Sequence, residues 1–278
     1  VSKEKPVVHH IINQARRLLP VGGTLTMTGA KNDGIKTYAE KAGHYFGDQQ
    51  RLEKQGTLYR VRIRHLTSTE TALEDQQYAL IRPCVAWEDG LLFSKPGQFG
   101  WNKIDQGSAF LATHLKDFFQ SLERPPTSIL DLGCGYGYLS VMAAQLTDAE
   151  ITATDNNAAA IASCQRNFIE QQIKGKVVAS NCGDSLTQHF DAIICNPPFH
   201  LGFNTDHGLT RRFVASCHRL LRNGGRALFV VNRFVPLERF AEADFDVKKL
   251  DENRSFKLIL LTRPAGRRHQ NTRPVGTE

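Results

Sequence analysis

The sequence Asn196-Pro197-Pro198-Phe199 follows directly on the apolar run 192–195, which has the length of a buried strand. Open α/β folds bind ligands at the carboxyl ends of their strands. There, the Asn196 side-chain oxygen and the Pro197 carbonyl can accept hydrogen bonds from an amino group, orienting its lone pair and stabilising the positive charge that develops as it attacks a carbon. Both prolines stiffen the turn, and Phe199 offers a ring on which a planar base can stack. We expect these four residues to be catalytic.

Methyl transfer to a conjugated exocyclic amine fits this chemistry. Such an amine is a poor nucleophile that needs orientation, and it can lose its proton to water after the transfer, so no general base is required. No cysteine lies in a loop suited to attack a pyrimidine ring, which argues against carbon-5 methylation. The structural alternative is that these residues only form a rigid loop after a strand.

A glycine-rich loop, Asp131-Leu132-Gly133-Cys134-Gly135-Tyr136-Gly137, lies between a predicted strand and a predicted helix. Glycine is needed where the backbone passes close to a ligand or adopts a positive φ. The spacing differs from the dinucleotide fingerprint, and an acid two residues before the first glycine would repel a pyrophosphate. The same acid would attract the cationic amino group of a methionine moiety. The loop therefore predicts S-adenosylmethionine as the cofactor, with contacts at Asp131, Gly133, Cys134, Gly135 and Gly137. We expect Asn196 to contact this cofactor as well as the amine.

Polar residues after the next two strands are candidates for binding the rest of this cofactor. Asp155 ends one strand, where its carboxylate can accept both ribose hydroxyls, and Asn156 follows it. Capping of the next helix is the alternative role for Asp155. Asn181 follows the third strand, where such folds bind the adenine; Asp184 competes for this role, and either can be a turn residue. Upstream, the segment around Gly107 is similar to one that folds over the methionine end, although a helix cap explains it almost as well.

Strand and helix patterns alternate over residues 126–265, which predicts a parallel sheet with helices on both faces. The last two strands can close as an antiparallel hairpin. We therefore expect an α/β, Rossmann-like fold with a mostly parallel seven-stranded sheet and a terminal antiparallel hairpin, the pattern of class I methyltransferases. The expected strands span 128–132, 151–154, 177–180, 192–195, 227–231, 245–250 and 256–262. The expected helices span 109–119, 139–146, 158–173 and 209–221.

The amino-terminal part contains an internal repeat. Residues 17–25 align with residues 219–227, since both read as a helix end, a Gly-Gly turn and a strand. Leu52 and a strand at 58–63 parallel Leu250 and the strand that begins at Phe256. We interpret the amino-terminal part as a partial, degenerate second copy of the same fold. A chance match of a common unit is the alternative.

This organisation gives three parts: residues 1–82 as the partial degenerate copy, 83–265 as the catalytic domain and 266–278 as a basic flexible tail. Short strands are expected at 78–81 and 91–94 in the connecting segment. The chain begins at Val1 without an initiator methionine, which suggests an amino-terminally truncated fragment.

Composition narrows the classes of partner. The net charge of +7 favours a polyanionic partner. The six cysteines contain no C-x-x-C pair, so we expect small buried thiols and no metal site. No apolar stretch approaches the ~18 residues needed to cross a bilayer, so no membrane partner is expected. Five arginines near the expected catalytic edge in sequence are candidate phosphate contacts, with a solvated helix face as the alternative: Arg211, Arg212, Arg219, Arg222 and Arg226.

The motifs at 131–137, Asp155, 196–200 and Asn232 together resemble the small-subunit (16S) ribosomal RNA guanine-N2 methyltransferase family, over essentially the whole chain. The resemblance implies two tandem methyltransferase folds, of which only the second is active. It also implies a cytoplasmic, monomeric enzyme that acts on 16S ribosomal RNA within the 30S subunit, without a metal. It assigns cofactor contacts to Asp131, Gly133, Gly135, Asp155 and Asn181, and catalysis to residues 196–199. One departure is Cys182-Gly183-Asp184 in place of an apolar pair after Asn181, which leaves the adenine contact open.

Other activities remain open at this point. Adenine-N6 and protein-glutamine methyltransferases share the Asn-Pro-Pro-Phe motif, and large-subunit guanine-N2 enzymes are the nearest rivals. A non-catalytic RNA-binding assembly factor is an alternative of a different class, against which the intact Asp131, Asp155 and Asn196 argue.

Overall fold

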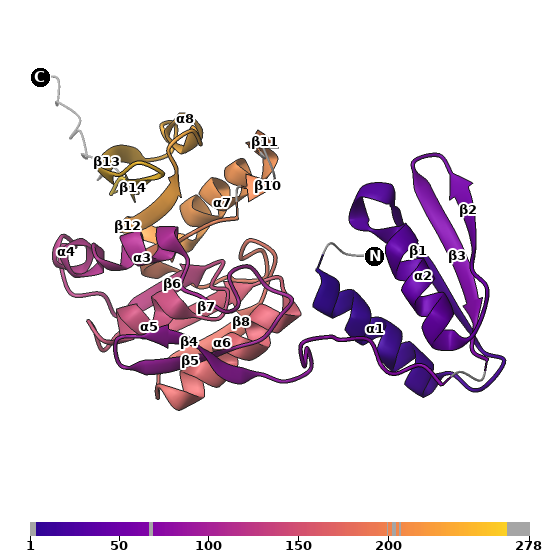
Figure 1. Cartoon of the computed structure of the whole chain (residues 1–278). Helices are drawn as coiled ribbons and strands as arrows, with labels where there is room; N and C mark the ends of the chain where they lie inside the picture. The colour runs from indigo at the N-terminus through magenta and orange to yellow at the C-terminus, as the bar shows by residue number, and fades with distance from the viewer. Residues whose placement is uncertain (1–3, 67–68, 199, 202–203, 206, 266–278) are drawn as a thin grey trace, which may run out of the picture. The chain divides into compact units, whose positions relative to one another are not determined.

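A computed structural model describes residues 4–66, 69–198, 200–201, 204–205 and 207–265 (Figure 1). Its contacts divide the chain into two units. The first comprises Val1–Val85 and Phe93–Asn102, and the second comprises Ala86–Leu92 and Lys103–Glu278. The expected flexible tail at 266–278 lies outside the described residues.

The first unit contains a three-stranded antiparallel sheet whose helices pack on one face. Its sheet has the order β1-β3-β2. The core between helices and sheet contains Ile12, Ile35, Phe46, Val61 and Ile63, all almost fully buried. The elements are α1 (Lys5–Leu18), β1 (Thr24–Ala30), the 3₁₀ turn η1 (Lys31–Asp33), α2 (Ile35–Phe46), β2 (Arg51–Gln55) and β3 (Leu58–Arg64).

The connecting segment forms a two-stranded sheet, β4 (Arg82–Trp87) and β5 (Gly90–Ser94). The expected strand at 91–94 therefore exists, but the one at 78–81 is wrong. Gln76 and Gln77 both have a φ of 53°, which turns the chain, and the Tyr78 amide donates to the Asp75 carbonyl at 3.0 Å. This turn prevents the extended backbone that the apolar residues suggested.

The second unit is built on a seven-stranded sheet of order β13-β14-β12-β9-β6-β7-β8. β12, β9, β6, β7 and β8 run parallel, and β14 is antiparallel to both β12 and β13. This confirms the predicted fold class, with its mostly parallel sheet and terminal hairpin. The strands are β6 (Ser128–Leu132), β7 (Glu150–Asp155), β8 (Gly175–Ala179), β9 (Phe190–Cys195), β12 (Leu221–Asn232), β13 (Asp246–Glu252) and β14 (Phe256–Thr262); β10 (His200–Leu201) and β11 (Asn204–Thr205) form a small separate hairpin.

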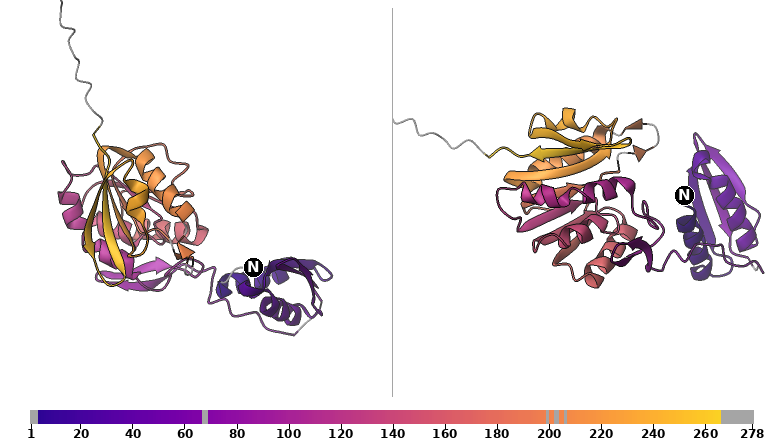
Figure 2. Two further views of the ribbon diagram at one scale, coloured as in Figure 1. Left: turned by 90° about the horizontal axis from the view of Figure 1, so that it is seen from above. Right: turned by 60° about the vertical axis from the view of Figure 1, so that its left-hand side comes forward.

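Helices cover both faces of this sheet (Figures 1 and 2). One buried cluster joins the sheet to Phe213 and Leu237, and the other joins it to Leu111, Leu139 and Phe168. The expected helix at 109–119 is interrupted at residues 113–114, so α3 and α4 are separate. The helices are α3 (Gln106–Ala112), α4 (Leu115–Gln120), α5 (Tyr138–Ala144), α6 (Ala158–Glu170), α7 (His207–Leu220) and α8 (Leu237–Ala241).

The two units share a hydrogen-bonded turn as well as a topology. In the first, the Gly22 amide donates to the His65 carbonyl and the His65 amide donates to the Gly23 carbonyl, both at 2.7 Å. In the second, Gly224 and Arg263 make the equivalent bond at 2.9 Å, and the Arg263 amide donates to the Gly225 carbonyl, also at 2.9 Å. The order β2-β3-β1 therefore repeats as β13-β14-β12, with the same strand directions.

The cysteines behave as small buried side chains. Five of the six are buried, Cys84 is half-buried, and all are free thiols. Burial raises the pKa of the Cys217 thiol above its usual range, which keeps it protonated and unreactive.

Candidate active site

The carboxyl ends of three adjacent strands bring the predicted site residues together. Asp131 in β6 pairs with Ala153 of β7 on one side and with Ile194 of β9 on the other. The glycine loop, Asp155 and Asn196 therefore follow neighbouring strand ends. The Cys195 thiol donates to the Leu132 carbonyl at 2.9 Å, which ties the start of one loop to the start of the other.

Backbone conformation explains the three glycines of the loop. Gly133, Gly135 and Gly137 have φ values of 85°, 55° and 91°, which L side chains rarely adopt. A Cβ on Gly137 would lie 2.7 Å from the Cys164 thiol, so this glycine also allows α5 to begin against α6. A Cβ on Gly135 would meet no heavy atom within 4 Å, so the space beside it is open to a ligand. Cys134 is buried, so only its backbone can serve a ligand.

Asp155 links the loop to the following helix. Its Oδ2 accepts from the Gly135 amide at 3.0 Å and its Oδ1 accepts from the Asn157 amide at 2.8 Å. The cap of α6 is Asn157, whose side chain accepts from the Ala159 amide at 2.8 Å. Helix capping therefore does not account for Asp155. Its half-buried carboxylate stands beside the open space at Gly135 with lone pairs still available.

Asp131 carries the strongest electrostatic signal of the site. Its carboxylate is fully buried, and burial raises its pKa to about 7 even though Ser140 Oγ donates to Oδ2 at 2.7 Å. Its Oδ1 is buried and has no hydrogen-bond partner within the part of the chain that the structure describes. A buried acceptor without a donor fits a cationic ligand group, such as the amino group of a methionine moiety.

The two rivals for the adenine contact have different surroundings. Asn156 Nδ2 donates to Asn181 Oδ1 at 3.5 Å. Both side chains are exposed and in contact, and Asn156 follows Asp155 directly in the chain. Asp184 instead forms an ion pair with Arg212 at 3.0 Å. This favours Asn181, although its contact with adenine stays a prediction.

Asn196 is held by an acidic helix cap. Its Nδ2 donates to Asp105 Oδ2 at 2.8 Å and to Ser108 Oγ at 2.7 Å. Because an ionised carboxylate only accepts hydrogen bonds, Nδ2 must face Asp105, which leaves Oδ1 on the opposite side of the amide. The same Asp105 oxygen accepts from the Ser108 amide at 2.9 Å and thereby caps α3. The cap interpretation of this segment is thus confirmed, and the cap has a second task.

Gly107 and the prolines shape the surroundings of this amide. A Cβ on Gly107 would lie 3.0 Å from Asp105 Oδ2 and 3.1 Å from the Phe256 ring, so glycine leaves room for the acid. Its contact with a cofactor stays a prediction. Pro197 is buried and Pro198 is exposed. Phe199, the predicted stacking residue, lies outside the described residues.

Two features escaped the sequence analysis. The anchoring of Asn196 by Asp105 joins residues 91 positions apart, and no local pattern indicates it. The other is Phe234, whose side chain is 88% exposed just after β12. β12 runs beside β9 and past its end, and the Phe234 amide donates to Asn232 Oδ1 at 3.1 Å. A signal existed: Asn-Arg-Phe after one strand parallels Asn-Pro-Pro-Phe after its neighbour.

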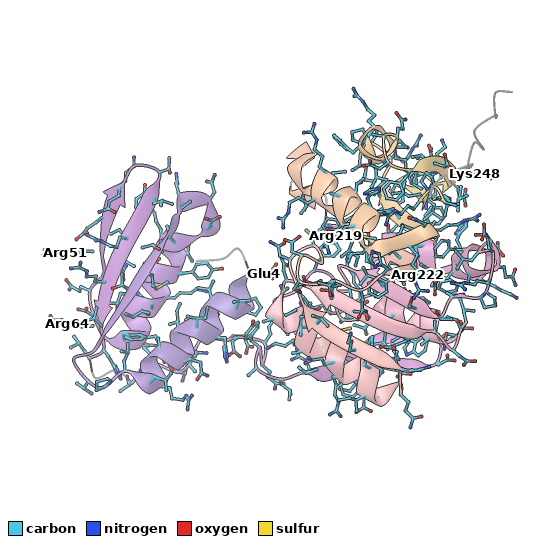
Figure 3. All side chains as sticks on the ribbon, turned by 180° about the vertical axis from the view of Figure 1, so that it is seen from behind. Glu4, Arg51, Arg64, Arg219, Arg222 and Lys248 are labelled. Carbon is cyan, nitrogen blue, oxygen red and sulfur yellow. The ribbon has the colours of Figure 1, made fainter. Side chains whose placement is uncertain are left out.

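All five candidate arginines make internal contacts. Arg211 lies over the Phe240 ring, and Arg212 pairs with Asp184 at 3.0 Å. Arg219 donates to the Gly183 carbonyl and Arg222 to Asp191 at 2.6 Å (both arginines are labelled in Figure 3), and Arg226 donates to the Ser121 carbonyl at 2.7 Å. Arg222 and Arg226 lie beside the amino-terminal half of β9, at the sheet edge opposite Asn196. Their closeness to Asn196 in sequence is therefore not closeness in space, and a phosphate contact by these two arginines would lie away from the catalytic edge.

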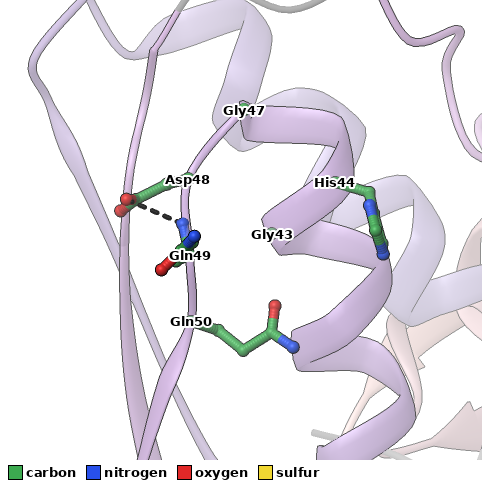
Figure 4. Close-up of a pocket in the computed structure, with 6 residues that line it drawn as sticks. All are labelled: Gly43, His44, Gly47, Asp48, Gln49 and Gln50. Carbon is green, nitrogen blue, oxygen red and sulfur yellow. Dashed lines mark hydrogen bonds between the residues drawn. The ribbon is translucent and has the colours of Figure 1, made fainter.

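A shallow depression in the first unit lies at the carboxyl end of α2 (Figure 4). The Asp48 carboxylate in it already accepts from the backbone amides of Gln49 and Arg64. None of the predicted site residues lines this depression. Its lining residues are Gly43, His44, Gly47, Asp48, Gln49 and Gln50.

The described residues contain no group of three or more histidine, cysteine or acidic side chains that could hold a metal ion. Nor does any helix in these segments have the length and apolar character to span a membrane.

The chain is similar to known methyltransferases. Residues 89–260 match the family described as the methyltransferase small domain. Ribosomal RNA small subunit methyltransferase C of Mannheimia succiniciproducens is 30% identical over 261 residues, which covers 92% of this chain and 75% of the relative. The protein of the same name from Erwinia tasmaniensis is 31% identical over 265 residues, covering 92% and 72%.

A solved structure has a similar fold over most of this chain. It is the T. thermophilus 16S rRNA N2 G1207 methyltransferase in complex with AdoMet and guanosine. The TM-score is 0.80 at 26% sequence identity, and the match covers 93% of this chain and 69% of that one.

Proposed function

Because the chain belongs to the methyltransferase small domain family, and within it to the ribosomal RNA small subunit methyltransferase C family, we propose that it methylates the N2 amine of a guanine in 16S ribosomal RNA, with S-adenosylmethionine as cofactor. The orientation of the Asn196 amide carries this proposal. Two acceptors fix its Nδ2, so its Oδ1 faces away from Asp105 and can accept from an incoming donor such as an amine.

The residues present fit the cofactor. Asp131 offers an unsatisfied buried acceptor to the amino group, Asp155 offers a carboxylate to the ribose hydroxyls, and the open space at Gly135 admits the ligand between them. When bound, S-adenosylmethionine supplies an electrophilic methyl group on a sulfonium. Asn156 and Asn181 would receive the adenine, and Gly107 would lie near the methionine end.

The acceptor side of the reaction rests on residues 196–199. Asn196 Oδ1 and the Pro197 carbonyl accept hydrogen bonds from the amine, aim its lone pair, and stabilise the positive charge that it gains as the new N–C bond forms. The methylated amine then releases its proton to water. Phe199 stays the residue on which we expect the base to stack, and Phe234, exposed just after β12, offers a second aromatic face for a base of the substrate.

We further propose the setting of this activity. The substrate is 16S ribosomal RNA in the 30S subunit, and the enzyme works as a monomer. Because its substrate is ribosomal, we expect the enzyme to work in the cytoplasm. Residues 1–82 form a partial, degenerate copy of a fold that residues 83–265 form in full. The turn that both parts share, at Gly22 and Gly224, supports this.

Nucleoside analysis tests the proposed function. The protein is incubated with S-adenosylmethionine and, separately, with unmodified 30S subunits, naked 16S ribosomal RNA and DNA, and the digested products are analysed by mass spectrometry. We expect N2-methylguanosine from the ribosomal substrates, and at least a hundredfold slower formation of it, about 10²–10³-fold, with an Asn196→Ala control. N6-methyladenosine or methylglutamine as the main product would replace the proposal with an alternative activity. Cofactor binding without any product would identify a non-catalytic factor.

A further inference from the structure

The sheet of the first unit exposes a row of arginines on the face away from its helices. Along β3, Val61 and Ile63 point into the core beneath α1 and α2, so the alternate residues Arg60, Arg62 and Arg64 point to the other face. Figure 3 shows Arg51 of β2 and Arg64 on this side of the sheet, away from the helices. We call these four side chains, Arg51, Arg60, Arg62 and Arg64, the arginine face.

Two of these arginines stand directly opposite each other. The register pairs Arg51 with Arg62, and both are exposed. Like charges in such cross-strand positions destabilise a sheet. Glu53 is opposite Arg60 and binds it at 2.5 Å, so this carboxylate is already engaged. The structure records no ion pair for Arg51, Arg62 or Arg64 within the residues it describes. Asp48 accepts from the Arg64 backbone amide.

The second unit shows what the same positions hold when a helix covers the face. The shared turn and register equate Arg60 with Leu258 and Arg62 with Leu260. Both leucines are buried in the cluster that contains Leu111 of α3. Their partners on β12, Leu228 and Val230, lie in the same cluster and correspond to Thr26 and Thr28 of β1.

The exchange of apolar for basic and hydroxyl side chains identifies the occupant of the face. Buried leucines suit an apolar helix, whereas exposed guanidinium groups such as those of Arg51, Arg62 and Arg64 suit the phosphates of a nucleic acid backbone. Spacing along the strand supports this, because alternate residues lie about 6.6 Å apart. That distance is comparable with the separation of successive phosphates in a single strand.

We propose that the arginine face binds the phosphate backbone of the RNA substrate at a site separate from the catalytic edge. The inference rests on the proposed function for the identity of the RNA, but the binding itself does not require methyl transfer. The face adds affinity without base specificity, because every nucleotide carries the same phosphate group. It therefore acts on substrate capture and leaves the chemical step unchanged.

Salt-dependent binding tests the proposal with the full chain. The probes are a short single-stranded RNA of mixed sequence and transcribed 16S ribosomal RNA, measured by fluorescence anisotropy over a range of salt concentrations. The triple variant Arg51→Gln/Arg62→Gln/Arg64→Gln should bind roughly tenfold more weakly, with a salt slope shallower by about 2. A matched triple, Arg124→Gln/Lys174→Gln/Lys248→Gln, removes the same charge from the second unit and should change the slope little.

Glu53→Gln changes the charge of the same face in the opposite direction, toward more positive. It releases Arg60 and removes a negative charge, so RNA binding should strengthen and its salt slope should steepen by up to about 1. Equal losses in both triple variants, or no effect of Glu53→Gln, would overturn the proposal and indicate a response to total charge only.

Stability and activity separate the remaining outcomes. Relief of the Arg51–Arg62 repulsion predicts that Arg62→Gln keeps or raises the Tm, so weaker RNA binding cannot be ascribed to unfolding. The triple variant should raise KM for ribosomal RNA and leave kcat and cofactor affinity unchanged. If the parent protein methylates RNA and the triple variant binds RNA as the parent does, RNA binding by the arginine face is refuted and the proposed function stands. If the triple variant has an altered salt slope but the parent forms no methylated product, the proposed function is refuted and RNA binding by the arginine face stands.

Discussion

Asn196 Nδ2 lies 2.8 Å from Asp105 Oδ2, so the residue that caps α3 also fixes the amide expected to receive the substrate amine. Since Ser108 Oγ accepts the second hydrogen at 2.7 Å, the amide cannot rotate without losing both bonds. The catalytic orientation is thus set by a segment far away in the chain.

Asn196→Ala should lower kcat about 10²–10³-fold, because the oxygen that stabilises the developing charge is removed. Asp105→Ala should lower kcat about 10²-fold by releasing the amide from its orientation. In both variants the cofactor Kd, measured by calorimetry, should change little. A loss of cofactor affinity as large as the loss of kcat would assign Asn196 to the cofactor and not to the amine.

Asp131→Asn should raise the stability of the fold above pH 7 and weaken the binding of the cofactor. In the folded chain the Asp131 pKa is about 7, against 3.8 for the exposed group, so the unfolded chain releases its proton first as pH rises. The carboxyl therefore lowers stability progressively between about pH 4 and pH 7, by roughly 4 kcal/mol at most. The variant should match the parent at pH 4 and exceed its Tm at pH 8.

The same group makes cofactor binding dependent on pH. Below pH 7 Asp131 is protonated and presents no charge to an ammonium group, so affinity should rise with pH up to about 7 and then level off. Asp131→Asn should bind roughly tenfold or more weakly above pH 7 and lose this pH dependence. Titration calorimetry at several pH values measures both effects. A parental pH dependence that survives in the variant would contradict this role of Asp131.

Phe234→Ala should raise KM for the RNA substrate roughly tenfold, because stacking of a base is worth about 1–3 kcal/mol. Phe234→Trp should restore binding, since it keeps an aromatic face. Phe99 is 78% exposed in the first unit, so Phe99→Ala is a matched control that should leave KM unchanged. Equal effects of the two alanine variants would show that Phe234 has no special place beside the substrate.

Arg222→Gln should destabilise the fold without affecting RNA binding. Asp191 accepts from Thr127, Ser128 and Arg222; burial alone would raise its pKa, but these donors lower it to about 2. Loss of the charged bond should cost about 2 kcal/mol at neutral pH and lower the Tm by several degrees. Because the Asp191 pKa is depressed, this stabilisation persists at neutral pH and is lost only as pH falls through about 2. A changed salt slope for RNA binding would instead place Arg222 in the RNA interface.

The sequence was sufficient for the features that depend on local order. Apolar runs predict strands that end close to Asp131, Asp155 and Asn196. Because parallel strands place their carboxyl ends at one edge of a sheet, the sequence alone predicts that these three residues lie near one another. The Asp105–Asn196 bond could not be predicted, because it depends on where α3 packs. The same limit applies to Arg222, which follows a helix that begins near the catalytic edge but ends at the opposite one.

Local patterns failed where a single backbone angle decides the structure. The apolar residues near Tyr78 have strand composition, but the left-handed residues Gln76 and Gln77 form a turn there. The helix expected across residue 113 is broken because the Thr113 and His114 side chains both bond to the Phe110 carbonyl.

The turn that both units share accepts different side chains in the same place. His65 bonds through Nδ1 to the Leu19 carbonyl, and Arg263 donates to the equivalent Leu221 carbonyl. Because main-chain hydrogen bonds hold this turn in both units, the outward-facing side chains can differ between them. Placing the leucines of the second unit at the equivalent positions of the first, as in Arg60→Leu/Arg62→Leu, would turn a charged surface into an exposed apolar one. Such a protein should self-associate or aggregate.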